Sequence, residues 1–170
     1  MPAYLRSKGK QRCEKEMIEV LNLSVLAVSF FLILADQAVK LGIARTMQLG
    51  ESIPVLQGIF HITYIENPGA AFGMFANQRW VFIVAGIFVV FAAGVMYRRI
   101  SETGRLVRLG AALLLGGAVG NLIDRIRLGR VIDFLDFRVW PVFNIADIGI
   151  CVGVACLIYA LMRDGEKERE

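Results

Sequence analysis

The sequence predicts an all-α integral membrane protein with four transmembrane helices, a small β-sheet on its outer face and an interfacial amphipathic segment. The chain is 56% hydrophobic and its mean hydropathy is +0.59, whereas soluble domains are about 45–50% apolar. Four apolar runs each have about the 17–25 residues that cross a bilayer as a helix. The Lys and Arg residues also gather on one side of these runs, as the positive-inside rule describes.

The apolar runs place the transmembrane helices at residues 20–39, 80–97, 106–123 and 142–162. Because no remaining piece is long enough to bury its own core, the whole chain, 1–170, is expected to be a single membrane domain. The two tails are residues 1–19 and 163–170. The two outer segments are residues 40–79 and 124–141, and the cytoplasmic loop is residues 98–105.

The distribution of basic residues predicts the orientation. Twelve of the 19 Lys and Arg lie in the two tails and around the loop between the second and third helices, and six lie in the outer segments. We therefore expect both termini in the cytoplasm, with the charged first tail disordered. The net charge of +4 is explained by this topology, and no basic patch interleaved with aromatic residues suggests nucleic acid.

The first helix ends with Asp36 and Lys40, which are four residues apart and so share a helical face. An acidic group near the end of a span usually faces the bundle or a wet cavity. We expect this pair to line a polar site. The alternative is a structural ion pair at the interface, with Lys40 extending to the headgroups.

The outer segment that follows contains a β-strand. Ile59–Ile65 is rich in β-branched and aromatic residues, and it lies between Gly58 and the turn Asn67-Pro68-Gly69. We expect a small sheet resting on the outer leaflet. The small residues that continue from Gly69 to Gly73 allow the backbone to approach a neighbouring helix or an extended substrate.

The second helix has no ionisable residue and is expected to be scaffold. Gly-xxx-Gly faces on the third helix (Gly116, Gly120) and the fourth (Gly149, Gly153) are expected to bring these two helices together. Residues 126–141 alternate apolar side chains with charged ones, which is typical of an amphipathic segment at the membrane interface.

Two matching tetrads flank that segment. Asn121-x-x-Asp124 ends the third helix and Asn144-x-x-Asp147 begins the fourth. Because the two helices run in opposite directions, we expect Asp124 and Asp147 at the same depth near the outer surface, with Asp36 at a similar level.

Two neighbouring carboxylates share a proton, because both ionise together only at a cost, and such a pair can hydrolyse a peptide bond through an activated water. With His61 as the single histidine, a Ser–His–Asp triad is not expected. On the residues alone, three readings stay open: a catalytic dyad, an ion or proton relay, and a structural role.

The motifs, taken together, resemble those of the bacterial lipoprotein signal peptidases (signal peptidase II). The resemblance extends from about residue 20 to 162, in matching order and spacing. It is carried by Asp36-x-x-x-Lys40, Asn67-x-Gly69-Ala70-Ala71-Phe72, Gly120-Asn121-x-x-Asp124-Arg125, Val131-x-Asp133-Phe134 and Phe143-Asn144-x-Ala146-Asp147.

The resemblance implies an intramembrane aspartic endopeptidase of the bacterial cytoplasmic membrane, with its site near the outer face. It would remove the signal peptide of a prolipoprotein just before a diacylglyceryl cysteine, without metal or cofactor, and be inhibited by globomycin-type cyclic peptides. A monomer surrounded by membrane lipids is expected. By this match Asp124 and Asp147 are catalytic, and the substrate-binding or supporting residues are Asp36, Lys40, Asn67, Gly69, Asn121, Arg125, Asp133 and Asn144. The alternative is a small proton- or cation-coupled transporter that uses the same carboxylates.

Overall fold

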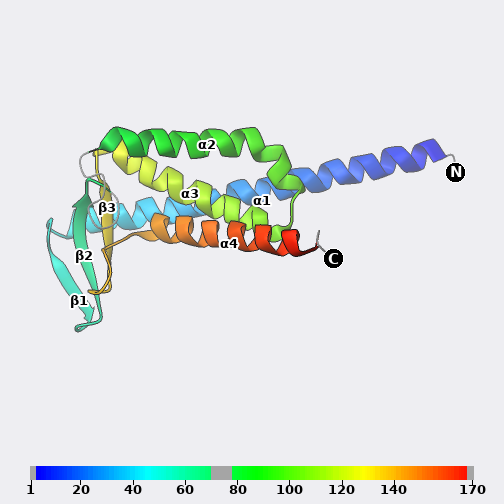
Figure 1. Ribbon diagram of the computed structural model, residues 1–170. Helices are drawn as coiled ribbons and strands as arrows, with labels where there is room; N and C mark the ends of the chain where they lie inside the picture. The colour runs from blue at the N-terminus through cyan, green and yellow to red at the C-terminus, as the bar shows by residue number, and fades with distance from the viewer. Residues whose placement is uncertain (1–2, 70–77, 168–170) are drawn as a thin grey trace.

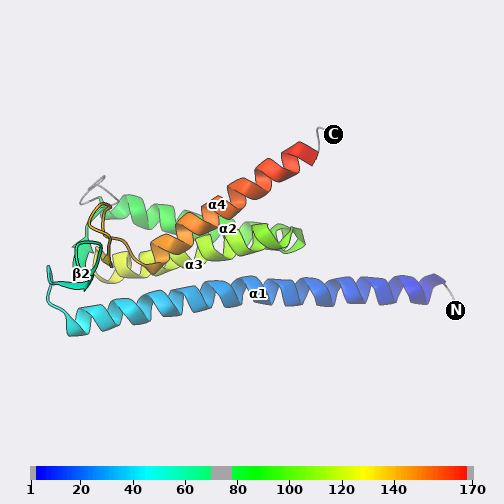
Figure 2. The same cartoon turned by 90° about the horizontal axis from the view of Figure 1, so that it is seen from below.

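The computed structural model describes residues 3–69 and 78–167 and consists of a helical bundle with a small sheet at one end (Figure 1). The sheet lies at the end of the bundle opposite to both termini, and α1 extends beyond the other helices toward the N-terminus (Figures 1 and 2). In chain order the elements are α1 (Ala3–Thr46), β1 (Ser52–Leu56), β2 (Phe60–Asn67), α2 (Arg79–Glu102), α3 (Arg105–Arg127), β3 (Val131–Asp136) and α4 (Ile145–Lys167).

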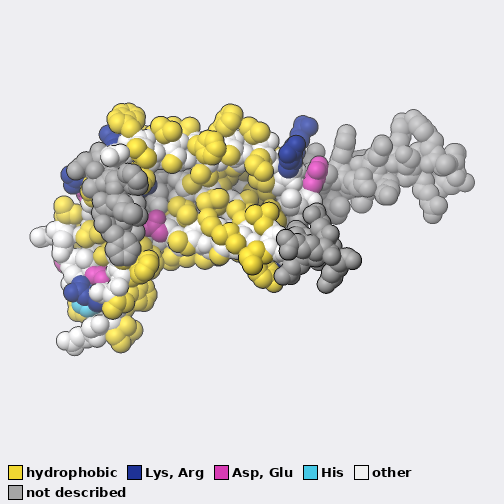
Figure 3. Space-filling view, in the orientation of Figure 1, with side chains coloured by type: hydrophobic (Ala, Val, Ile, Leu, Met, Phe, Trp, Pro, Cys, Tyr) yellow, Lys and Arg dark blue, Asp and Glu magenta, His cyan; other side chains and the backbone are white. Residues whose placement is uncertain are grey.

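Each of the four helices contains a stretch long and apolar enough to cross a membrane, at Leu23–Thr46, Arg79–Ile100, Arg105–Arg127 and Ile145–Arg163. Hydrophobic side chains cover most of the face of the bundle that the space-filling view shows (Figure 3). The predicted fold class is confirmed, and the protein is a multi-pass membrane protein.

Helix α3 is central, because it packs against α1, α2 and α4. Glycines on different sides of α3 allow this. A Cβ at Gly116 would lie 2.9 Å from the carbonyl oxygen of Ser29 on α1, and a Cβ at Gly153 of α4 would lie 2.7 Å from the carbonyl oxygen of Gly110. The predicted close approach of α3 and α4 is present, but Gly116 serves the contact with α1 instead.

The three strands form an antiparallel sheet in the order β1-β2-β3. The predicted strand corresponds to β2, whose ends pair with β3 at His61 with Asp136 and at Asn67 with Val131. The segment predicted as amphipathic forms β3, and every residue of β3 except Leu135 is buried. Its two carboxylates, Asp133 and Asp136, do not make a polar outer face, because both accept hydrogen bonds inside the protein.

Several helix ends differ from the prediction. Helix α1 begins at Ala3, so the tail expected to be disordered is helical, and it continues to Thr46. Helix α3 continues to Arg127. Helix α4 begins only at Ile145, because Phe143 pairs with Leu135 and extends the backbone beside β3.

Candidate active site

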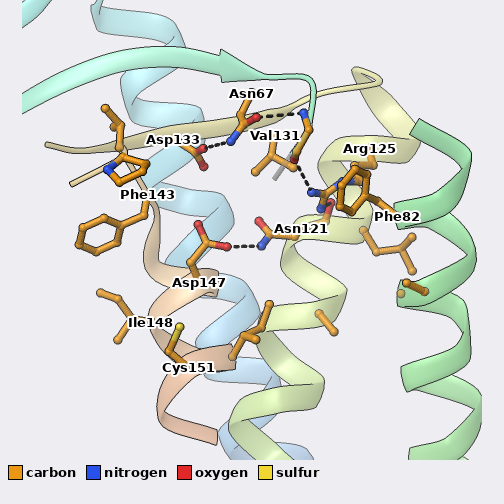
Figure 4. A pocket seen from close by; sticks show the side chains of 18 of the residues that line it. Asn67, Phe82, Asn121, Arg125, Val131, Asp133, Phe143, Asp147, Ile148 and Cys151 are labelled. Atoms are coloured by element: carbon orange, nitrogen blue, oxygen red, sulfur yellow. Dashed lines mark hydrogen bonds between the residues drawn. The ribbon is translucent and has the colours of Figure 1, made fainter. Parts of the chain in front are cut away.

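A cavity of about 820 Å³ lies beside α2, α3 and α4, next to the end of β2 and the start of β3 (Figure 4). Most of its lining is apolar, but polar residues gather at one end. The residues of this polar end are Asn67, Gly69, Asn121, Arg125, Asp133 and Asp147. Two carboxylates, those of Asp133 and Asp147, therefore line the same cavity.

Asp147 is oriented by the first turn of α4. Asn144 precedes the helix, and its Oδ1 accepts a hydrogen bond from the backbone N–H of Asp147 at 2.9 Å. Asp147 Oδ2 in turn accepts the backbone N–H of Asn144 at 3.2 Å. This reciprocal arrangement is a capping box, which needs a spacing of three residues. The Asn-x-x-Asp pattern thus has a local cause, and a carboxylate suits the positive end of the helix dipole.

Asp133 projects from β3 toward the same space as Asp147 (Figure 4). Its Oδ1 accepts a hydrogen bond from Asn144 Nδ2 at 2.6 Å, and its Oδ2 accepts one from Asn67 Nδ2 at 2.9 Å. Burial, together with the neighbouring charge of Asp147, raises the pKa of Asp133 to about 7. A carboxyl group with this pKa exchanges its proton near neutral pH.

Asn121 connects the cavity to the interior of the bundle. Its Nδ2 donates to Asp147 Oδ1 at 2.7 Å. Its Oδ1 accepts hydrogen bonds from Lys40 Nζ and from Asn144 Nδ2, each at 3.1 Å. Because an ammonium group is donor only, Lys40 determines which way the Asn121 amide faces, and so directs the amide's donor toward Asp147.

Behind Asn121 lies a buried ion cluster, which consists of Asp36, Lys40 and Asp124. Lys40 Nζ lies 2.8 Å from Asp36 Oδ2 and 2.8 Å from Asp124 Oδ2, and the three side chains are at most 3% exposed. Asp36 and Lys40 were expected to line a polar site, but they pair with each other behind the cavity and do not line it. Lys40 is buried and does not extend to the headgroups. Buried charges of this kind are held by mutual pairing, and removing one partner is costly.

Asp36 and Asp124 also accept hydrogen bonds from neighbouring elements of the protein. Asp36 Oδ1 accepts the backbone N–H of Ala146 at 2.9 Å, at the start of α4. Asp124 Oδ1 accepts a hydrogen bond from Gln37 Nε2 at 3.0 Å, and Asp124 Oδ2 accepts the backbone N–H of Ile132 at 3.3 Å. The cluster therefore joins α1 to α3, to the start of β3 and to α4.

Arg125 lies across the polar end of the cavity from Asp147 (Figure 4), and Gly69, which is bonded to Arg125, also lines the cavity. Arg125 Nη2 donates to the carbonyl oxygen of Gly69 at 3.2 Å, and its guanidinium lies 4.5 Å from the ring centroid of Phe82. Asn67 Oδ1 accepts the backbone N–H of Gly69 at 2.9 Å. These contacts attach the end of β2 to α3. Ala70, Ala71, Phe72 and Gly73, which complete the predicted motif, lie outside the described residues.

The ten predicted site residues thus divide into two connected groups. Asn67, Gly69, Asn121, Arg125, Asp133, Asn144 and Asp147 surround or support the polar end of the cavity, whereas Asp36, Lys40 and Asp124 form the ion cluster. The sequence predicted Asp124 and Asp147 as the catalytic pair, but Asp124 does not line the cavity that Asp147 lines, and its Oδ2 lies 2.8 Å from the Lys40 ammonium.

Sequence reasoning assigned Asp133 a supporting role and overlooked Gln37. The available signal for Asp133 was a carboxylate with apolar neighbours on both sides, which is expensive to bury without a reason. Gln37 gave no comparable signal. Among the described residues, no group of three or more His, Cys, Asp or Glu side chains is arranged to hold a metal ion.

Comparison with known proteins identifies the family. Residues 28–163 match the family model described as signal peptidase (SPase) II. The chain is 47% identical over 137 residues to a lipoprotein signal peptidase of Halothermothrix orenii, covering 81% of this chain and 94% of the relative. It is 46% identical over 146 residues to one of Moorella thermoacetica, covering 85% and 97%.

A solved structure agrees with these relatives. It is a bacterial membrane enzyme determined by the in meso method at 2.3 Å resolution, with a TM-score of 0.81 and 32% identity, and the alignment covers 86% of this chain and 92% of that one. The transporter alternative receives no support from any of these matches. With its family model spanning nearly the whole bundle and its relatives matched over most of their length, this chain belongs to the signal peptidase II family of membrane proteases.

Proposed function

We propose that this protein is an aspartic endopeptidase that removes the signal peptide from diacylglyceryl-modified prolipoproteins, cleaving just before the lipidated cysteine. We further propose that Asp133 and Asp147 are its catalytic dyad, in place of the pair Asp124 and Asp147 expected from the sequence. The observation that carries the assignment is that Asp133 and Asp147 line one cavity, while Asp124 is bonded to the Lys40 ammonium.

The dyad acts with one carboxyl protonated and one ionised. We assign the proton to Asp133, whose pKa is raised to about 7 by burial and by the charge of Asp147. We assign the charge to Asp147, which accepts hydrogen bonds from Asn121 and from the backbone of Asn144 at the start of a helix. A carboxylate can then act as a general base and its neighbour as a general acid.

The reaction follows the aspartic-protease pattern. Asp147 takes a proton from a water molecule as the water oxygen bonds to the carbonyl carbon of the scissile peptide. Asp133 donates a hydrogen bond to that carbonyl oxygen as negative charge develops on it. The C–N bond then breaks, and the amine of the lipidated cysteine leaves with a proton from the dyad. The products are a free signal peptide carboxylate and a free amino group.

The shape of the cavity suits such a substrate. Its polar end holds the dyad, and its apolar walls continue along α2, α3 and α4 through Phe82, Val89, Leu114, Ala118, Ile150 and Val152. Apolar walls of this kind bind hydrophobic groups. The substrate supplies two of them, the signal segment and the acyl chains.

We also propose that the protein lies in the bacterial cytoplasmic membrane as a monomer, with both termini in the cytoplasm and the dyad near the outer face. The excess of Lys and Arg near the termini supports this orientation. The sheet lies at the end away from both termini (Figure 1), and the dyad residues belong to β3 of that sheet and to the first turn of α4, which supports the orientation as well. Inhibition by globomycin-type cyclic peptides follows from the family resemblance.

The decisive experiment uses the purified full-length protein with a diacylglyceryl prolipoprotein and with the same prolipoprotein left unmodified. We expect mass spectrometry to find a product that starts at the lipidated cysteine, only from the modified substrate. A globomycin-type peptide and the Asp147→Asn substitution should both abolish that product. Continued cleavage by folded Asp147→Asn protein would refute the proposed function.

A further inference from the structure

The turn between β3 and α4 forms one wall of the cavity. Its aromatic residues Phe137, Trp140 and Phe143, here called the aromatic wall, all line the cavity. The rings of Phe137 and Phe143 stack, with centroids 5.9 Å apart and planes 9° apart, and Phe60 of β2 lies 4.9 Å from Phe137. Trp140 remains 59% exposed, so the wall presents apolar surface toward the space beside the dyad.

The backbone of this turn contains an unusual residue. Arg138 has φ of +65°, and among the described residues it is the one non-glycine residue with positive φ. The left-handed region is disfavoured for a residue that carries a Cβ, so surrounding contacts must hold Arg138 in place.

Asp136 provides those contacts. Its Oδ1 accepts the backbone N–H of Arg138 at 2.8 Å. Its Oδ2 accepts hydrogen bonds from Arg138 Nη1 at 3.0 Å and from Thr63 Oγ1 at 2.7 Å. Asp136 is 5% exposed, and Thr63 is in turn bonded to Ser52 at 2.8 Å. The carboxylate thus attaches the turn to β2 and, through Ser52, to β1.

The reversal at Arg138 brings the chain back along β3. Phe143 N–H donates to the carbonyl oxygen of Leu135 at 3.1 Å, and Leu135 N–H donates to that of Phe143 at 2.8 Å. Helix α4 begins two residues after Phe143. The position of the aromatic wall relative to Asp147 therefore depends on the geometry at Asp136 and Arg138.

We propose that Asp136 and Arg138 are positioning residues, which hold the aromatic wall where it binds the acyl chains of the lipidated cysteine. The inference rests on the proposed function. Because the scissile bond directly precedes that cysteine, its acyl chains branch off within one residue of the dyad. The last residue of the aromatic wall, Phe143, lies four residues before Asp147 in the chain. The wall therefore places apolar surface close to the point where the acyl chains branch from the substrate.

The test compares two prolipoprotein substrates that differ only in the length of their acyl chains. In Asp136→Ala, we expect KM for the long-chain substrate to rise about tenfold to a hundredfold, the loss expected when a hydrogen bond to a charged group is removed, while kcat stays within about twofold. For the short-chain substrate, KM should change less than twofold. Equal changes with both substrates, or a fall in kcat with unchanged KM, would overturn the proposal.

A second substitution separates backbone positioning from a general loss of structure. Glycine adopts positive φ without steric cost, so Asp136→Ala with Arg138→Gly should recover part of the lost affinity. Asp136→Ala with Arg138→Ala should not recover it. If the two double variants behave alike, the aromatic wall does not depend on the conformation of residue 138. The milder Asp136→Asn is the substitute if Asp136→Ala fails to fold, and its effect should have the same direction.

The position of the aromatic wall can be followed without catalysis. Trp80 and Trp140 are the two tryptophans of the chain, so Trp80→Phe leaves Trp140 as the single reporter. Asp136→Ala should shift its emission and increase its quenching by acrylamide, and added Arg138→Gly should reverse part of both changes. Unchanged Trp140 emission in Asp136→Ala would overturn the proposal.

Two controls complete the design. Arg130 also pairs with a carboxylate, Glu66 at 3.7 Å, but on an exposed surface, so Arg130→Ala should leave KM and Trp140 emission unchanged. Asp147→Asn tests the proposed function separately. If Asp147→Asn is inactive while Asp136→Ala behaves as wild type, the inference fails and the proposed function stands.

Discussion

Asn121 connects two sets of carboxylates that have different bonding partners. In the ion cluster, Asp36 and Asp124 share the ammonium group of Lys40 at 2.8 Å each. In the cavity, Asp133 and Asp147 are bonded by neutral amides from Asn67, Asn121 and Asn144. The carboxylates of the ion cluster are held in a buried ion pair, whereas Asp133 and Asp147 line the cavity that a substrate would enter.

The comparison explains why closely matching motifs have different roles. Asn121-x-x-Asp124 ends a helix, where its aspartate meets Lys40 from α1. Asn144-x-x-Asp147 begins a helix, where the same spacing forms a capping box and leaves Asp147 at the cavity. Position relative to the helix end therefore decides what each aspartate contacts.

The largest expected effect is on kcat, and it distinguishes the carboxylates of the cavity from those of the ion cluster. Asp133→Asn and Asp147→Asn should each lower kcat by about 10³-fold or more, as the loss of a catalytic group does. Asp124→Asn should retain measurable turnover in the fraction of protein that folds, because Lys40 still has Asp36 as a partner. Turnover of purified, monodisperse variants is the measurement. An inactive but fully stable Asp124→Asn, together with an active Asp133→Asn, would return the dyad to Asp124 and Asp147.

The next effect concerns stability. Lys40→Met should lower the free energy of unfolding by about 3–5 kcal/mol, because it leaves two buried carboxylates without their cation. Thermal unfolding in detergent measures the loss. Adding Asp36→Asn and Asp124→Asn to Lys40→Met removes the uncompensated charges and should recover part of it. If the triple variant is no more stable than Lys40→Met, charge pairing does not explain the role of the cluster.

A smaller effect on turnover is expected at Asn121, which connects the ion cluster to Asp147. Asn121→Ala removes the 2.7 Å hydrogen bond to Asp147, and a bond to a charged group contributes about 1.5–3 kcal/mol. We expect kcat to fall about 10- to 100-fold. Gln37→Ala is the matched control, since Gln37 bonds Asp36, Gly120 and Asp124 and should affect stability more than turnover. The reverse pattern would mean that Asn121 does not orient the dyad.

The smallest effect is on pH dependence. The proposed mechanism needs a protonated Asp133, whose pKa is about 7 through burial and the charge of Asp147, so kcat/KM should fall as pH rises above about 7. The hydrogen bond from Asn67 lowers that pKa. Asn67→Ala should therefore move this decline to higher pH, in a profile measured from pH 5 to 9. A shift to lower pH would contradict the assignment of the proton to Asp133.

Local features of the site could be predicted because they depend on short spacings. Asp36 and Lys40 pair across one helical turn, and the spacing of Asn144 and Asp147 is that of a capping box. The role of Asp133 could not be predicted in the same way. Its position requires β3 to pair with β2, which brings Asn67 within 2.9 Å of a carboxylate 66 residues later in the chain.

The sequence by itself determined the membrane class, the four spans, the strand at β2 and the family, because hydrophobic length and motif order are properties of the chain alone. Only the tertiary structure decided which aspartate lines the cavity together with Asp147. Asp124 and Asp133 are nine residues apart and similar in kind, but one meets Lys40 in the bundle and the other meets the cavity. The physical reason is that the charge state of a buried carboxyl group depends on partners that folding brings from distant parts of the chain.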